Sequence, residues 1–210
     1  MGCLMEKAVV TPDQYPLSLN ALVNACNQKS SRDPVMNLDP GVVQRAVNDL
    51  VAKRLVMVQN FGSRVDKYQQ RLCNTQFAQL QFTPAEYAIV CLLFLRGPQT
   101  PGELKAHSGR LHEFKDLSEV ESALSSLLDR PAGPLVARLP REPRRKDHAY
   151  AHLFSGPVES VARDEEQPES GGAPASRSTA PSGLAELEAR VARLERELAS
   201  LKEALGIATE

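Results

Sequence analysis

The chain has 210 residues, of which 42% are hydrophobic, 24% are charged and only 5% are aromatic, and it contains no tryptophan. A net charge of −1 excludes a strongly basic protein that coats nucleic acid. No apolar run approaches the ~20 residues that a membrane-spanning helix needs, so a soluble globular protein without a membrane partner is expected.

Residues 1–76 are predicted to form a unit of three helices followed by a β-hairpin. Thr11 and the proline after it open a short helix, because proline suits a first turn where its missing N–H is not needed. A longer amphipathic helix starts after Asp39. Its expected buried positions are Val43, Ala46, Val47 and Leu50. Alternating apolar residues predict hairpin strands at 55–59 and 67–72.

Residues 77–156 repeat this order of elements. Thr83 is predicted to cap an opening helix, and Thr100 opens a short second helix. A long third helix is predicted from Ser118, which with Glu121 has the spacing of a capping box. Its expected buried positions are Val120, Leu124, Leu127 and Leu128. The two strands of a second hairpin are predicted at 135–139 and 149–154. The repeated order, mainly α with small β-hairpins, indicates tandem winged-helix domains.

The last quarter of the chain has a different composition. Residues 157–183 are rich in glycine, proline, serine and acidic residues and lack aromatic side chains, which predicts a disordered linker. Residues 184–206 are predicted to form a coiled-coil helix, because leucine and valine recur at alternating spacings of three and four. The predicted dimerisation positions are Leu184, Leu187, Val191, Leu194, Leu198, Leu201 and Leu205. Charges beside this seam favour parallel self-association, and packing of the helix on the folded part is the alternative.

Three segments carry long, specific runs of sequence. They are residues 3–31, which include Thr11 to Leu22 and Asn24 to Ser30, residues 95–104, and Tyr150 to Phe154. These runs resemble the YceH family of bacterial proteins, and the resemblance covers residues 1 to about 156. It implies two winged-helix domains in a cytoplasmic bacterial protein, and it implies no established activity. Four cysteines without a CxxC pair are also typical of a reducing cytoplasm.

The sequence contains no catalytic motif of a familiar class. It lacks a Walker A loop, a GxGxxG fingerprint, a GxSxG elbow and an HExxH pair. His148 and His152 are spaced as in some zinc sites, but no paired cysteines precede them. We therefore expect neither an enzyme nor a protein with a cofactor or a metal.

The charge distribution makes double-stranded DNA the favoured partner. Residues 155–210 carry six basic and eleven acidic side chains, so the first 154 residues hold 19 basic and 15 acidic ones. The predicted base-reading and groove-facing residues are Gln44, Arg45, Asn48 and Lys53. The predicted phosphate-contacting residues are Lys29, Arg32, Arg64, Lys67, Arg141, Arg144, Arg145 and Lys146. These features predict a DNA-binding, regulatory protein.

A protein-interaction role is the alternative. The third helix of the second unit carries Glu119, Glu121 and Asp129, whose charges would repel phosphate. An acidic third helix suits an adaptor that binds a protein partner without DNA. A further alternative is that the polar side of the helix at residues 40–53 is an ordinary solvent-exposed face that does not contact DNA.

Overall fold

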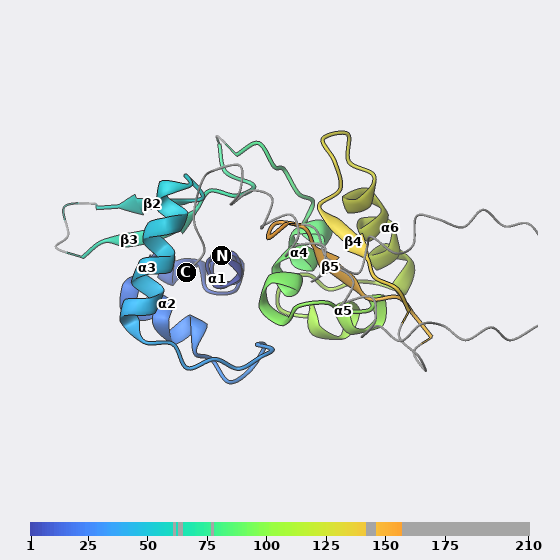
Figure 1. The fold of residues 1–210 in the computed structure, drawn as a ribbon, viewed down its shortest axis with the longest axis horizontal. Helices are drawn as coiled ribbons and strands as arrows, with labels where there is room; N and C mark the ends of the chain where they lie inside the picture. Colours follow the sequence, from blue (N-terminus) through green and yellow to red (C-terminus); the bar gives the residue numbers. More distant parts are fainter. Residues whose placement is uncertain (61, 63–64, 77, 142–145, 157–210) are drawn as a thin grey trace, which may run out of the picture. The chain divides into compact units, whose positions relative to one another are not determined.

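The computed structural model describes residues 1–60, 62, 65–76, 78–141 and 146–156. Within this part of the chain, two successive halves show the same order of three α-helices followed by a two-stranded hairpin (Figure 1). No helix in the described ranges has both the length and the hydrophobicity to span a bilayer. The predicted disordered linker (residues 157–183) and the predicted coiled-coil helix (residues 184–206) lie outside the described residues.

The first half forms a small three-stranded sheet beside its helices. Its elements are α1 (Gly2–Val10), a 3-10 turn (Pro12–Gln14), β1 (Leu17–Ser18), α2 (Leu19–Cys26), α3 (Pro40–Ala52), β2 (Val56–Gln59) and β3 (Lys67–Gln70). Strand β3 lies in the middle, antiparallel to both neighbours, and Tyr68 is opposite Leu17 on one side and Val58 on the other. The hairpin β2–β3 is confirmed, whereas the sequence did not predict β1 because two residues show no periodicity.

The second half repeats this order. Its elements are α4 (Pro84–Arg96), α5 (Pro101–His107), α6 (Leu117–Leu128), β4 (Val136–Arg138) and β5 (Tyr150–His152). Strands β4 and β5 are antiparallel, and a single bridge between Gln99 and Tyr150 takes the place that β1 has in the first half. Thr83 caps α4 as predicted, in a capping box with Glu86.

Two local predictions are wrong. Helix α6 starts at Leu117, and the side chain of Asp116 accepts a 2.9 Å hydrogen bond from the backbone N–H of Glu119, so Ser118 is not the cap. Aspartate caps helices as well as serine does, and it stands two residues earlier. On α3, Val43 and Val47 are buried as expected, but Ala46 is exposed.

The buried residues of both halves belong to one continuous hydrophobic core. Helix α1 contacts α4, where the Tyr87 hydroxyl donates a 2.9 Å hydrogen bond to the carbonyl of Met5. At Gly2 the backbones approach so closely that a Cβ atom would lie 2.8 Å from Cβ of Phe94. The two halves therefore share buried contacts across the predicted domain boundary between residues 76 and 77. The division into two domains stays a prediction.

Candidate nucleic-acid interface

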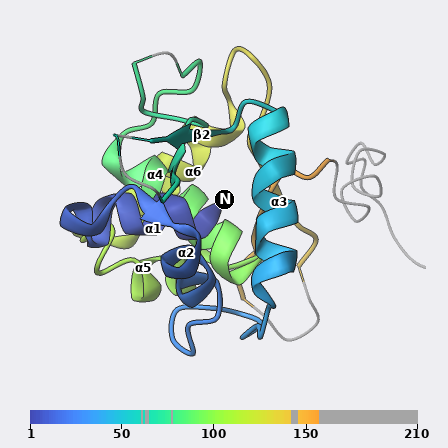
Figure 2. The same ribbon diagram turned by 90° about the vertical axis from the view of Figure 1, so that its left-hand side faces the viewer.

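Helix α3 has one apolar face and one polar face. Val43 and Val47, one turn apart, are buried, and Figure 2 shows α1 and α2 on the same side of α3. Arg45 and Asn48 are exposed, and Gln44 is half-buried beside them. The predicted outward direction is therefore confirmed for Arg45 and Asn48, because the apolar spacing fixes the opposite face, whereas Gln44 is only partly exposed.

The polar face of α3 contacts the hairpin through a side-chain hydrogen bond. Gln44 Nε2 donates a 2.8 Å hydrogen bond to Oδ1 of Asn48, and it lies 3.4 Å from the hydroxyl of Tyr68. Tyr68 belongs to β3 and is only 5% exposed. Its hydroxyl therefore positions the Gln44–Asn48 amide pair from within the fold. Tyr68 was not among the predicted functional residues, although the strand alternation in 67–72 places it on the inward face.

Basic side chains lie around this face. Lys53 directly follows α3, Lys67 begins β3, and Lys29 stands before α3; all three are exposed. Arg54, which was not among the predicted contacts, is also exposed and has a backbone φ of 59°. The left-handed conformation is costly for a residue with a side chain. The predicted phosphate-contacting Arg64 lies outside the described residues.

Arg32 is buried, which contradicts its predicted role as a phosphate contact. Its side chain is 1% exposed, and its Nη2 lies 2.6 Å from the carboxylate of Glu6 on α1. It also donates to the carbonyl of Ala25 and, at 2.8 Å, to Oε1 of Gln28. Burial opposes the charge, but the Glu6 carboxylate outweighs it and raises the pKa of Arg32. Arg32 therefore holds α1, α2 and the following loop together and cannot reach a phosphate.

The polar groups of α6 are acidic or hydroxyl-bearing, and several already form hydrogen bonds with other parts of the chain. The carboxylate of Glu119 accepts hydrogen bonds of 2.8 Å from the backbone N–H of Lys115 and 2.9 Å from Nε2 of His112. These two hydrogen bonds lower the pKa of Glu119. Ser126 Oγ donates a 2.6 Å hydrogen bond to Glu86. This helix therefore offers anionic and neutral groups where α3 offers amides and a guanidinium.

The second hairpin carries exposed cations on both sides of its tip. Arg138, Arg141 and Lys146 are exposed, and Arg141 Nη1 donates to the carbonyl of Lys146 over 3.3 Å. The predicted contacts Arg144 and Arg145 lie outside the described residues, as do the seven dimerisation positions.

The two histidines near β5 have separate local partners. His148 Nδ1 lies 2.8 Å from the carbonyl of Leu139, and the ring centroid of His152 lies 4.6 Å from that of Phe94, with the two rings tilted by 41°. In the described ranges no three His, Cys, Asp or Glu side chains are grouped so that they could hold a metal.

Comparisons with known proteins establish the family. The model of a family described as a protein of unknown function, DUF480, matches residues 1–145. A UPF0502 protein of Shewanella woodyi is 55% identical over 208 residues, which cover 98% of this chain and 93% of that protein. The UPF0502 protein YceH of Escherichia fergusonii is 48% identical over 206 residues, covering 98% and 90% of the two chains.

The chain therefore belongs to the DUF480 family, a bacterial family of unknown function. The resemblance to YceH that the sequence carries is confirmed.

Proposed function

We propose that residues 1–156 are two winged-helix units and that the first binds double-stranded DNA in a regulatory, non-enzymatic role in the bacterial cytoplasm. The element order supports this proposal, since each half has a helix, a strand or bridge, two further helices and a hairpin. In this class of fold the third helix enters the major groove and the hairpin contacts the backbone.

The observation that carries the proposal is the polar face of α3. Gln44 and Asn48 present amides, and Arg45 presents a guanidinium, on the exposed face of one helix. Asparagine and glutamine pair bidentately with adenine, and arginine pairs with guanine. Because Tyr68 holds the Gln44 amide, less side-chain freedom is lost when a base edge replaces the Gln44–Asn48 hydrogen bond.

Phosphate contacts would surround this face. Lys29, Lys53 and Lys67 are exposed in the same half, and Arg141 and Lys146 are exposed on the second hairpin. Cations at such positions fix the register of a protein on DNA without reading sequence. They also make affinity depend on salt, because each phosphate contact releases counterions.

The proposal includes self-association through the leucine and valine positions of residues 184–206. Two copies of α3 could then occupy successive major grooves about 34 Å apart. Deletion of residues 184–210 should lower the mass measured by sedimentation, and an unchanged mass would reject this part of the proposal.

A fluorescence anisotropy titration with random duplex DNA at two salt concentrations tests the proposal. Salt-sensitive binding is expected, and substitution of Lys53 by Ala should reduce the salt slope by about one. Lys115→Ala is the matched control, because Lys115 is exposed in the second half. Absence of binding at low salt, or equal losses from both substitutions, would reject the proposal.

An adaptor role is the second candidate, and the surface of α6 favours it. The helix combines Glu121 with half-exposed Glu119, and repulsion from phosphate would keep DNA away. Val35 and Met36, 56% and 39% exposed, add apolar surface in the loop before α3. Absence of DNA binding together with a co-purifying protein that is lost on Val35→Ser, Met36→Ser substitution would support this role instead.

A further inference from the structure

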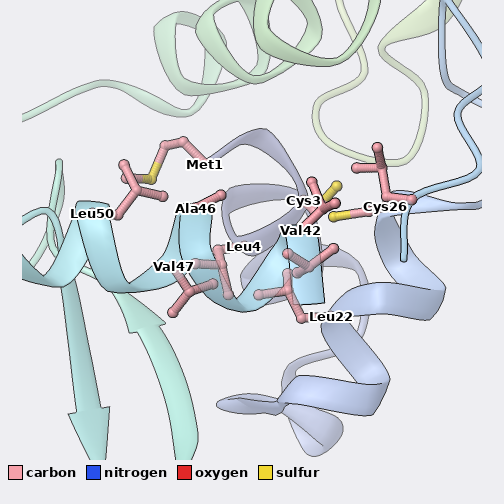
Figure 3. A pocket seen from close by; sticks show the side chains of 11 residues that line it. Met1, Cys3, Leu4, Leu22, Cys26, Val42, Ala46, Val47 and Leu50 are labelled. Atoms are coloured by element: carbon pink, nitrogen blue, oxygen red, sulfur yellow. The ribbon is translucent and has the colours of Figure 1, made fainter. Parts of the chain in front are cut away.

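A small apolar pocket lies between α1, α2 and α3 (Figure 3). Its walls are almost entirely aliphatic, with Leu22 and Val43 among them, and its volume of about 90 Å³ exceeds what a single water molecule needs. The two groups that break this apolar lining are the thiols of Cys3, on α1, and Cys26, at the end of α2. A molecule of the size of hydrogen peroxide therefore fits beside them.

The two thiols contact one another. Figure 3 shows the sulfur atoms of Cys3 and Cys26 next to each other, and Cys3 Sγ donates a 3.6 Å hydrogen bond to the carbonyl of Ala25, the residue before Cys26. The other two cysteines, Cys73 and Cys91, are fully buried at 0% exposure and do not line this pocket. The structure therefore brings together at one pocket two cysteines that are 23 positions apart in the sequence.

The surroundings of the pair give its members different roles. The hydrogen bond from Cys26, against the opposing effect of burial and with help from the Arg32 charge, lowers the pKa of Cys3 to about 6. Glu6 and the chain's amino group also act on Cys3, in opposite directions. The same hydrogen bond and burial raise the pKa of Cys26. Two adjacent thiols whose pKa values are shifted in opposite directions have the arrangement of an attacking and a resolving cysteine.

We propose that Cys3 and Cys26 form a peroxide-reactive dithiol site that closes to an intramolecular disulfide. The Cys3 thiol first loses its proton, and its sulfur attacks one oxygen of hydrogen peroxide. The O–O bond breaks, Cys3 becomes a sulfenic acid, and the departing hydroxide takes up a proton equivalent to the one that Cys3 released, which gives the first water. The Cys26 sulfur then attacks the Cys3 sulfur, the S–O bond breaks, and the leaving hydroxyl takes the Cys26 proton as water. The two thiols lose two electrons, and one peroxide becomes two waters.

The disulfide would link α1 to α2 and remove both thiols from the wall of the pocket. Helix α2 packs on α3, so the modified site lies beneath the helix that is proposed to read DNA. The chemistry of the dithiol does not depend on that function, and it can be measured without DNA.

Peptide mapping of the full chain tests the site. The reduced protein is treated with hydrogen peroxide, alkylated, denatured and analysed by mass spectrometry. The expected product is a Cys3–Cys26 disulfide within one chain, with Cys73 and Cys91 still alkylated as thiols. Survival of both pocket thiols, earlier oxidation of Cys73 or Cys91, or a disulfide between two chains would overturn the proposal.

Substitution of the resolving thiol gives a second test. In a Cys26→Ser variant, shown to be folded by circular dichroism, Cys3 should stop at sulfenic acid and react with a dimedone-type reagent. Cys73→Ser is the matched control and should form the same disulfide as the unsubstituted chain. Unlabelled Cys3 in the folded Cys26→Ser protein would contradict its role as the attacking thiol.

Discussion

Helices α3 and α6 occupy equivalent places in the two halves, but their exposed faces differ in chemistry. On α3 an amide pair and an arginine face solvent, and the amides are held by a tyrosine of the hairpin. On α6 the face is acidic and serine-rich, and Glu119 and Ser126 bond to neighbouring parts of the chain. The difference shows that one scaffold can carry two kinds of surface, so function has to be argued from the face and not from the fold.

The same contrast exists beneath the surface. Each half buries a glutamate on its first helix, Glu6 on α1 and Glu86 on α4. Glu6 meets the buried guanidinium of Arg32, whereas Glu86 bonds to Ser126 and to Thr83 and lies 3.5 Å from the more exposed Arg130. The first half thus depends on a buried ion pair, and the second depends on hydrogen bonds.

Removal of one partner of the buried ion pair should have the largest effect. Arg32→Ala removes the guanidinium that lies 2.6 Å from the buried Glu6 carboxylate and leaves Lys7, 3.6 Å away, as its cation. Loss of a buried ion-pair partner costs about 3–5 kcal/mol in the free energy of unfolding, and Lys7 places the expected loss at the lower end of this range.

Arg130→Ala, the matched change in the second half, should cost less, about 1 kcal/mol, because Ser126 and the backbone N–H of Thr83 still donate hydrogen bonds to the Glu86 carboxylate. Urea unfolding followed by circular dichroism measures both values. Equal losses of unfolding free energy in the two variants would contradict the proposed difference between the two halves.

The next effect is expected on DNA affinity. Replacement of Gln44 and Asn48 by Ala should weaken binding to a duplex selected for high affinity by about 10–100-fold, since a bidentate base contact is worth about 1–3 kcal/mol. Ser122→Ala with Ser125→Ala on the exposed face of α6 is the control and should leave affinity unchanged. If the α6 pair weakened binding more, the assignment of the two helices would be reversed.

Acid should destabilise the protein in part through Glu86. Burial opposes ionisation of this carboxyl, but hydrogen bonds from Ser126 and Thr83 outweigh it and lower its pKa below 4.5. A lowered pKa contributes stability that is present above the ordinary carboxyl pKa and is lost as the pH falls through the folded-state value. Glu86→Gln should therefore lower stability by about 1–2 kcal/mol at pH 7 and flatten its fall below pH 4.5. Parallel acid-unfolding curves would contradict this assignment.

The smallest effect is expected at Arg54. Its left-handed backbone suits glycine better than arginine, so Arg54→Gly should raise the free energy of unfolding by about 0.5–1 kcal/mol. If Arg54 contacts phosphate beside Lys53, the same change should weaken DNA binding and reduce its dependence on salt. A substitution that leaves both stability and binding unchanged would show that neither the strain nor the charge matters.

Local patterns in the sequence predicted much of this fold. The spacing of Val43 and Val47 gave the buried face of α3, and with it the outward direction of Arg45 and Asn48. Thr83 gave the start of α4, because a cap depends on residues only three positions apart. Ala46 was misassigned because it lies at the edge of the apolar stripe, where periodicity does not separate core from solvent.

Contacts between distant segments could not be predicted in this way. Arg32 was assigned to DNA because its partner Glu6 stands 26 positions earlier, and nothing local marks the pair. Tyr68 and Gln44 are 24 positions apart, and their contact requires the hairpin to lie against α3. The pairing of Cys3 with Cys26 also required the packed arrangement of α1 and α2. These long-range contacts position the candidate sites, so they became visible only in the structure.

An NMR titration of the full, isotopically labelled chain with duplex DNA tests the central claim most directly. Chemical-shift changes should concentrate at Gln44, Arg45, Asn48 and Lys67, while Ser122 on α6 stays unchanged. Changes centred on α6, or no changes anywhere at low salt, would contradict the account that the α3 face is a DNA-reading surface.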